Sequence, residues 1–326
     1  MNINLDIDVD KLWPTISLVR LNNMVAGAID FKLRLTDWLR MGFINISENI
    51  DNFIGPAIER LVDAQLVGFV NILSEIVDYD FSDDVYKYLL TNKFVYLYTL
   101  CDSLINIKNL SPEWQTEILV IAGVNVSKAD ILKFQPVNDL WMVLAVENNK
   151  IKFNNISKKT VWLVGCTSKK IACNIQFYKS DFHDEFNLNS GTYITSDFYF
   201  YRGIHSMRVL APKWNFSNSS FAPNAFNGIN IALKIFRKIV SENPFISQIP
   251  LIVSGLIFGL RNNKYCVSDV DNNVMPLQIT ENEVINLLCF TAGKPFSAFV
   301  FINEYFWKIL SIWSDSGFYS LNYEMS

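Results

Sequence analysis

The sequence is poor in the residues and motifs on which catalysis, metal binding and nucleotide binding usually depend. It has 2 histidines and 5 cysteines in 326 residues, and no two cysteines form a C-x-x-C pair. It contains no G-x-S-x-G, G-x-G-x-x-G or G-x-x-x-x-G-K-[ST] pattern. A nucleophile elbow and the usual phosphate-binding loops therefore have no support. We expect a protein that is not an enzyme and uses no cofactor.

An excess of basic charge and long apolar runs are also lacking. Lys and Arg number 28 against 32 for Asp and Glu, whereas a duplex-binding protein normally shows a basic face. Nucleic acid is therefore an unfavoured partner. The longest apolar stretch, Ile249–Leu260, has about half the ~20 residues that a membrane-spanning helix needs. We expect no membrane association.

Features of the N-terminus and of the cysteines indicate the compartment. The first ten residues, MNINLDIDVD, are acidic and lack the basic and apolar parts of a signal peptide. The cysteines are scattered and odd in number, which is typical of reduced thiols. The sequence therefore predicts a cytoplasmic protein.

What the sequence has in abundance is apolar residues, 50% of the chain, with 14% aromatic. Helical periodicity dominates as far as residue 137 and strand-like patterns dominate after residue 138. We predict an α+β fold: a helical module over residues 1–137, then a β-rich α+β module over residues 138–326 with two inserted helices. The helices of the first module are expected at about 18–46, 57–77, 83–105, 111–123 and 127–132.

In the second module, polar turns separate β-branched and aromatic runs. Glu147–Asn149 is expected to close a hairpin, and Thr192–Tyr201 to form a half-buried strand with an aromatic outer face. The two inserted helices are expected at 222–240 and after Thr280, where Thr280 and Glu283 have the spacing of a capping box. The remaining strands are expected near 160–168, 169–178, 207–210, 251–260, 263–269, 274–279, 297–303, 305–313 and 318–323.

Ala57–Gly68 places polar residues within an apolar helical run. Gln65 lies on the apolar stripe because it is four residues from both Leu61 and Phe69, and Arg60 and Asp63 are three apart. Pro56 suits the first turn of such a helix. The stretch is either a polar site or a structural network, and the network is the more frequent arrangement of buried polar groups. We predict an Arg60–Asp63 pair and a largely buried Gln65.

Aromatic and arginine side chains supply the other candidate interaction residues, which are Trp38, Tyr199, Tyr201, Arg202 and Arg208. These residue types are enriched where proteins bind one another. His183 stands in an acidic stretch, where a solvated turn is commoner than a metal site. His205 follows Gly203 at a strand break, where packing and one hydrogen bond are expected.

Several segments, in order along the chain, resemble the long region that follows the zinc finger in bacterial SWIM zinc finger domain proteins. They are GAIDFKLRLTDWLRMGF (Gly27–Phe43), RLVDAQLVGF (Arg60–Phe69), LLTNKFVYLYTLCDSL (Leu89–Leu104), DLWMVL (Asp139–Leu144), TVWLVG (Thr160–Gly165), GTYITSDFYFYRGIHSMRVL (Gly191–Leu210) and WKILSIWSDSGFYSL (Trp307–Leu321). The finger itself, a C-x-C pair followed by a C-x-H pair, is missing, so the resemblance carries no metal ligands to this chain.

The resemblance implies a function, because genes of such proteins typically stand beside those of MoxR-type AAA+ ATPases and von Willebrand factor A-type (VWA) proteins. It implies a non-enzymatic interaction or scaffold component that binds the ATPase or the VWA protein. Two alternatives stay open. One is a nucleic-acid-associated accessory protein, and the other is a hydrolase that uses His183 or His205.

Overall fold

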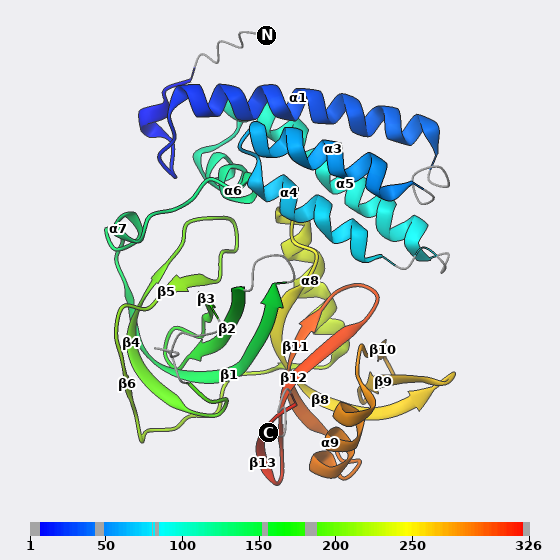
Figure 1. The fold of residues 1–326 in the computed structure, drawn as a ribbon. Coiled ribbons are helices and arrows are strands. Elements are labelled where there is room, and N and C mark those ends of the chain that lie inside the picture. The colour runs from blue at the N-terminus through cyan, green and yellow to red at the C-terminus, as the bar shows by residue number, and fades with distance from the viewer. Residues whose placement is uncertain are drawn as a thin grey trace. The chain divides into compact units, whose positions relative to one another are not determined.

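The computed structural model describes residues 7–42, 49–79, 81, 85–151, 156–179 and 188–321 (Figure 1). The chain divides into two compact units. The helical unit is Met1–Asp130 with the short segment Arg202–Ile204, and the β unit is Ile131–Tyr201 with His205–Ser326. Helices occupy the first part of the chain and two sheets occupy the second, which confirms the α+β class.

The helical unit follows the apolar periodicity of the sequence. Its elements are η1 (Val9–Lys11), α1 (Leu18–Met41), α3 (Ile50–Asp63), α4 (Val67–Ser74), η2 (Glu75–Asp78), α5 (Val85–Ile105), η3 (Ile107–Asn109) and α6 (Pro112–Ala122), and the short α7 (Lys128–Ile131) follows. The expected helices at 83–105, 111–123 and 127–132 are all present to within a few residues.

Local signals set several helix ends. Ser17 caps the start of α1, and Gly42, at φ 86°, ends it. The Ser111 hydroxyl accepts a hydrogen bond from the Trp114 N–H at the start of α6, and Pro112 occupies the first helical position. Gly123 ends α6 in the left-handed conformation, where a residue without a Cβ is favoured.

The stretch Ala57–Gly68 is not one helix, contrary to our prediction. Helix α3 begins at Ile50, so Pro56 lies inside it, and the helix ends at Asp63. Leu66 N–H bonds to Leu61 C=O at 2.8 Å, and Gln65 N–H bonds to Val62 C=O at 2.9 Å. This is a Schellman motif, in which Gln65, at φ 60°, takes the place usually held by glycine. The buried Leu61 and Leu66 complete the motif.

Two glycines allow backbones to approach closely within this unit. A Cβ on Gly27 of α1 would lie 2.3 Å from the Cβ of Ala64, and a Cβ on Gly68 of α4 would lie 1.8 Å from the Ile121 carbonyl oxygen of α6. Side-chain packing fills the interior around these crossings. Rings of Phe31, Trp38, Phe69 and Phe94 from α1, α4 and α5 form edge-on or tilted pairs with centroids 5.8 to 6.2 Å apart.

The first sheet of the β unit closes on itself. Its strands are β1 (Val137–Ile151), β2 (Ile156–Gly165), β3 (Ile171–Lys179), β4 (Tyr193–Phe200), β5 (Arg208–Leu210) and β6 (Trp214–Phe216). The order is β1-β2-β3-β5-β4, and β4 pairs with β1 again, so five strands form a barrel to which β6 is added. Strands β3 and β5 are parallel, and the other pairs are antiparallel.

The register of β1 corrects the predicted hairpin. Glu147–Asn149 lies within β1 and pairs with Lys158–Thr160 of β2, so the chain does not turn there. A bulge between Val143 and Ala145 bends this long strand, which lets its two halves pair with different neighbours. Glu147–Asn149, whose polar side chains suggested a turn, therefore lie near the C-terminal end of β1.

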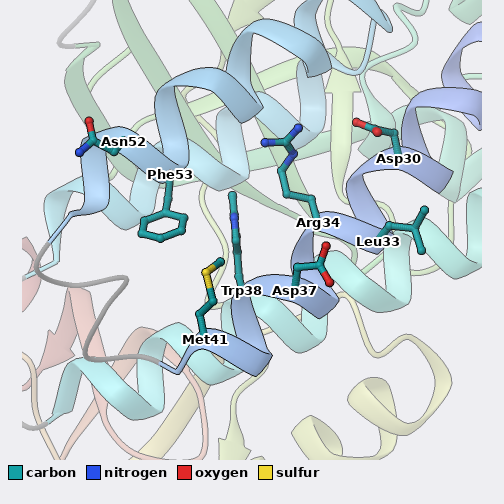
Figure 2. Close-up of a pocket in the computed structure, with 8 residues that line it drawn as sticks. All are labelled: Asp30, Leu33, Arg34, Asp37, Trp38, Met41, Asn52 and Phe53. Carbon is teal, nitrogen blue, oxygen red and sulfur yellow. The ribbon is translucent and has the colours of Figure 1, made fainter.

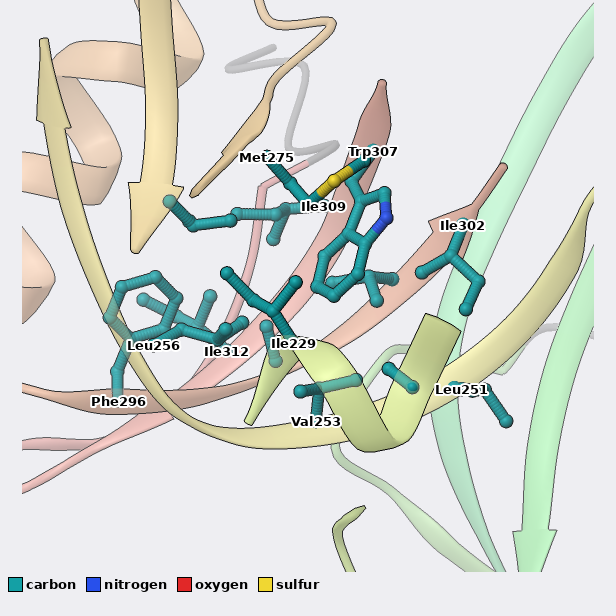
Figure 3. Packing of buried hydrophobic residues seen from close by; sticks show 14 of the residues in the cluster. Ile229, Leu251, Val253, Leu256, Met275, Phe296, Ile302, Trp307, Ile309 and Ile312 are labelled. Atoms are coloured by element: carbon teal, nitrogen blue, oxygen red, sulfur yellow. The ribbon is translucent and has the colours of Figure 1, made fainter. Parts of the chain in front are cut away.

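The second sheet has the order β10-β9-β8-β11-β12-β13. Its strands are β8 (Ile249–Arg261), β9 (Lys264–Ser268), β10 (Val274–Pro276), β11 (Phe296–Ile302), β12 (Trp307–Ser314) and β13 (Gly317–Ser320), and the short β7 (Phe226–Asn227) pairs with β8. Figure 3 shows the buried core against which these strands pack, with Trp307, Phe296 and Ile229 among its members.

The two inserted helices, α8 (Ile229–Glu242) and α9 (Glu281–Thr291), contribute Phe236 and Leu287 to that core. The Thr280–Glu283 capping box is present, as predicted. Helix α8 begins at Ile229, seven residues later than expected, because Gly228 at φ 80° and the Asp269 carboxylate define its start. Asp269 accepts a hydrogen bond of 2.8 Å from the Ile229 N–H.

The barrel and the second sheet share a further apolar cluster. Met142, Leu144 and Val164 from the outer side of β1 and β2 join Ile252, Phe299 and Leu310 from β8, β11 and β12. Glu147 links the same elements, because it accepts hydrogen bonds from Lys308 at 2.9 Å and from the Trp162 indole at 3.2 Å. The β unit is therefore two sheets joined through one side of the barrel.

Candidate interaction site on the helical unit

A pocket of about 440 Å³ opens between α1 and α3 (Figure 2). It is wide and open to solvent rather than enclosed. Helix α1 supplies most of the lining and α3 the rest. The lining residues are Asp30, Leu33, Arg34, Asp37, Trp38, Met41, Asn52 and Phe53.

The residues from α1 fall on one stripe of the helix. Their spacing of three, one, three, one and three residues from Asp30 to Met41 keeps successive side chains on the same face. The stripe combines charged and apolar side chains. The charged ones are Asp30, Arg34 and Asp37, and the apolar ones are Leu33, Trp38 and Met41. Helix α1 therefore presents both the charged and the apolar side chains of the pocket.

Apolar side chains form one end of the pocket. Trp38 is 3% exposed and packs edge-on against Phe53 with ring centroids 6.0 Å apart. Figure 2 shows Phe53 and Met41 directed toward one another beside Trp38. Leu33, by contrast, is 63% exposed. The pocket thus combines a fixed aromatic base with apolar side chains that a partner can cover.

Charged pairs border the pocket. The Arg60 guanidinium of α3 lies 3.5 Å from the Asp30 carboxylate, and Arg40 lies 3.2 Å from Asp37. All four side chains are more than half exposed, so each pair contributes at most about 1 kcal/mol to stability. Exposed charges of alternating sign favour orientation of a charged partner over stability of the fold.

The structure separates the polar residues predicted to act together on the second helix. Arg60 pairs with Asp30 of α1 rather than with Asp63, so the predicted pair is wrong. Gln65 is exposed, not buried, because the left-handed turn after α3 directs it away from the core. Trp38 and Arg60 lie at and beside the pocket, while Asp63 and Gln65 do not line it.

The other predicted interaction residues lie elsewhere, and all of them except Tyr199 take part in cation–π contacts. The Arg208 guanidinium lies 4.4 Å from the Tyr201 ring centroid in the β unit. Tyr199 is half-buried on β4, and its backbone pairs with Leu210 of β5. Arg202, in the helical unit, lies 6.0 Å from the Trp13 ring centroid.

Among the described residues, His205 and the cysteines show no arrangement that points to a reaction. His205, at φ 60°, is hydrogen-bonded through Nε2 to the Glu242 carboxylate at 2.7 Å, and His183 lies outside the described residues. Burial raises the pKa of the Cys101 and Cys173 thiols to about 12, which disfavours the reactive thiolate. All five cysteines are free.

Neither a metal-binding cluster nor a membrane-spanning helix is found among the described residues. No group of three or more His, Cys, Asp or Glu side chains in this part of the chain could hold a metal ion. Over the same residues, no helix is both long and apolar enough to cross a membrane.

Helices α1, α3, α4, α5 and α6 pack against one another in the helical unit (Figure 1). Residues 19–121 match a SWIM-associated four-helix bundle domain. The matched SWIM-associated bundle contains the whole pocket and both of its bordering ion pairs. The predicted resemblance is therefore supported for the bundle. No curated protein and no solved structure matches the chain.

Sequence reasoning missed most of the residues that line the pocket of the SWIM-associated bundle. Asp30, Leu33, Arg34 and Met41 were assigned only to a helical pattern. Their mixed stripe on α1 was the available signal, because an exposed leucine and methionine among charges do not belong to a core-facing surface. The contribution of α3 depends on how two helices pack, which periodicity does not reveal.

Proposed function

We propose that this chain is a non-enzymatic interaction component of an ATPase-linked system of the MoxR and VWA type. One observation carries the proposal: the SWIM-associated bundle presents an open pocket with an aromatic base, exposed apolar side chains and bordering charges. Trp, Arg and Met are enriched in protein interfaces, and an aromatic base in a pocket is typical of an anchor site. The resemblance along the chain supports the choice of partner.

The pocket suits a partner that inserts an apolar side chain. Met41 would cover that side chain over Trp38 and Phe53, and Leu33 would contact the partner at the other end of the α1 stripe. Asp30 and Asp37 would then face basic groups on the partner, and Arg34 an acidic one. Binding of this kind takes most of its affinity from the apolar contact and its orientation from the charges.

The test uses the purified full chain with a MoxR-type ATPase and a VWA protein from the same organism. We expect one of them to bind, with Kd measured by calorimetry. Leu33→Arg should weaken that binding at least about tenfold, equivalent to ~1.4 kcal/mol, because it replaces an exposed apolar side chain of the pocket lining with a charged one.

Val19→Arg is the matched control. Val19 also lies on α1, is 71% exposed and does not line the pocket. Its substitution should leave Kd unchanged. The proposal is overturned if neither protein binds, or if Val19→Arg weakens binding as much as Leu33→Arg.

A further inference from the structure

The barrel of the β unit has the strand order of the OB-fold. Five strands close in the order β1-β2-β3-β5-β4, with β3 and β5 parallel and with a long, bulged β1 that pairs with both β2 and β4. Barrels of this kind bind ligands on the outer face around strands 2 and 3 and the adjoining loops. The strand order alone does not establish a function, so a binding function has to be argued from the side chains on that face.

Alternation along the strands identifies the outer side chains. Val161 and Leu163 of β2, Ala172 of β3 and Val209 of β5 lie in the barrel core. Their sequence neighbours therefore point outward. Lys158 of β2 is paired with Phe177 of β3, and Cys173 of β3 is paired with Arg208 of β5, so these residues share the outer face.

This outer face interleaves cations with aromatic rings. Phe177 is 59% exposed, so its ring is accessible to a ligand. Its cross-strand neighbour is Lys158. Farther along the face, the exposed Arg208 stacks on Tyr201, and Tyr199 follows on β4. We call Lys158, Phe177, Tyr199, Tyr201 and Arg208 the barrel face.

The charge of the barrel segment differs in sign from that of the chain. Residues 137–216 contain 10 Lys and Arg against 6 Asp and Glu, whereas the whole chain has 28 against 32. The sequence of this segment is thus net positive although the whole chain is net negative, and it stays so without Arg202, which belongs to the helical unit. Net positive charge attracts phosphate groups.

The described acids of this segment have partners of their own. Glu147 accepts from Lys308, and Asp197 accepts from the Asn138 amide at 2.7 Å. Asp139 is buried and accepts from the backbone N–H groups of the 167–168 turn. The other three acids, Asp181, Asp184 and Glu185, lie outside the described residues. Lys158 and Arg208 are therefore not neutralised by a described carboxylate of the barrel face.

We infer that the barrel face binds single-stranded nucleic acid without sequence preference. Lys158 and Arg208 would contact backbone phosphates, and unpaired bases would stack on Phe177 and Tyr201. Stacking requires bases that are free of a duplex, and every base has a ring face, which makes such binding tolerant of sequence. The negative charge of the chain as a whole keeps duplex binding weak.

The test measures fluorescence anisotropy of labelled oligothymidine and oligouridine of about 20 nucleotides with the full chain, in about 50 mM salt. We expect saturable binding with Kd of about 1–100 µM, and weaker binding of a duplex of the same length. Oligothymidine and oligouridine distinguish DNA from RNA as the preferred strand. Either preference supports the inference.

Matched variants locate the site. Phe177→Ala should raise Kd about tenfold, while Phe216→Ala, which removes a 63% exposed ring from β6 away from the barrel face, should leave it unchanged. Lys158→Gln should reduce the slope of log K against log salt by about 0.7, and Lys264→Gln on β9 should not. These surface changes are checked for folding by circular dichroism.

Absence of binding to both single strands at low salt overturns the inference. So does equal loss of affinity in Phe177→Ala and Phe216→Ala, or a duplex that binds as tightly as the single strands. The result is independent of the pocket on the helical unit, because none of the substituted residues lies in that unit.

Discussion

Gly68 decides whether α4 and α6 can meet. A Cβ at this position would lie 1.8 Å from the Ile121 carbonyl oxygen and 2.7 Å from the Ala122 carbonyl carbon, so backbone atoms would have to move. We predict that Gly68→Ala lowers the free energy of unfolding by at least about 2 kcal/mol, the usual cost of overpacking. Urea denaturation followed by tryptophan fluorescence measures the change.

The same substitution at Gly55 is its control. Gly55 is an exposed residue of α3, and a Cβ there would meet nothing within 4 Å. Alanine improves helix propensity by about 1 kcal/mol, and the following Pro56 offsets part of this gain. Gly55→Ala should therefore stay within about 1 kcal/mol of the parent. Equal losses at Gly55 and Gly68 would contradict the close approach of α4 and α6.

At the scale of the element, the end of α3 depends on a left-handed residue that is not glycine. A side chain in this conformation costs roughly 1–2 kcal/mol, and Gln65 bears that cost at φ 60°. We predict that Gln65→Gly is more stable than Gln65→Ala by about 1 kcal/mol. Inside a helix the order is the reverse, with alanine better by about 1 kcal/mol.

Paired thermal melts of the two Gln65 variants test the turn directly. The sign of the difference in stability between Gln65→Gly and Gln65→Ala shows whether residue 65 ends α3 in a left-handed conformation or lies within the continuous helix that periodicity suggested. Alanine more stable than glycine would show that α3 and α4 are one helix in solution. Gln65 contributes to the turn through its backbone conformation and not through its side chain, which is exposed.

At the scale of the molecule, two buried carboxylates make the β unit sensitive to acid. Burial raises the pKa of Asp269, but hydrogen bonds from Asn273, Ile229 and Asp271 outweigh it and hold the pKa below its ordinary value. Burial also raises the pKa of Asp139, but hydrogen bonds from the backbone N–H groups of Ser168 and Thr167 outweigh it and hold this pKa below its ordinary value. Each group adds stability above its unfolded pKa of about 3.9.

That stability should be lost as the pH falls from about 5 through the lowered pKa values. We predict that Asp269→Asn costs about 2 kcal/mol at pH 7, because a charged hydrogen-bond acceptor becomes neutral. The variant should also show a weaker loss of stability between pH 5 and pH 3 than the parent. Urea denaturation at both pH values measures this, and an unchanged pH dependence would contradict the assigned role.

The two units carry surfaces of different chemistry. The SWIM-associated bundle presents an open pocket with mixed charge, which suits a protein partner. The barrel face presents cations and rings, which suit unpaired bases and phosphates. The two binding tests are separate because their variants lie in different units.

Sequence alone determined the features that depend on neighbours along the chain. The α+β class, the start of α1, both ends of α6 and the Thr280 capping box were all predictable, because periodicity, N-cap hydroxyls and terminal glycines act within a few residues. Tyr199 was also placed correctly on a strand, whereas Tyr201 follows the end of β4 at Phe200. The Gln65 stop was missed because a non-glycine residue holds a position where glycine is the usual signal.

Tertiary structure decided what depends on distant partners. Arg60 pairs with Asp30 instead of Asp63 because two helices pack side by side, and Glu147–Asn149 stays extended because β2 supplies a partner for it. Closure of the barrel requires β1 to meet β4 and β3 to meet β5, and no local pattern specifies such long-range pairing. The pocket and the barrel face both exist only because these distant segments come together.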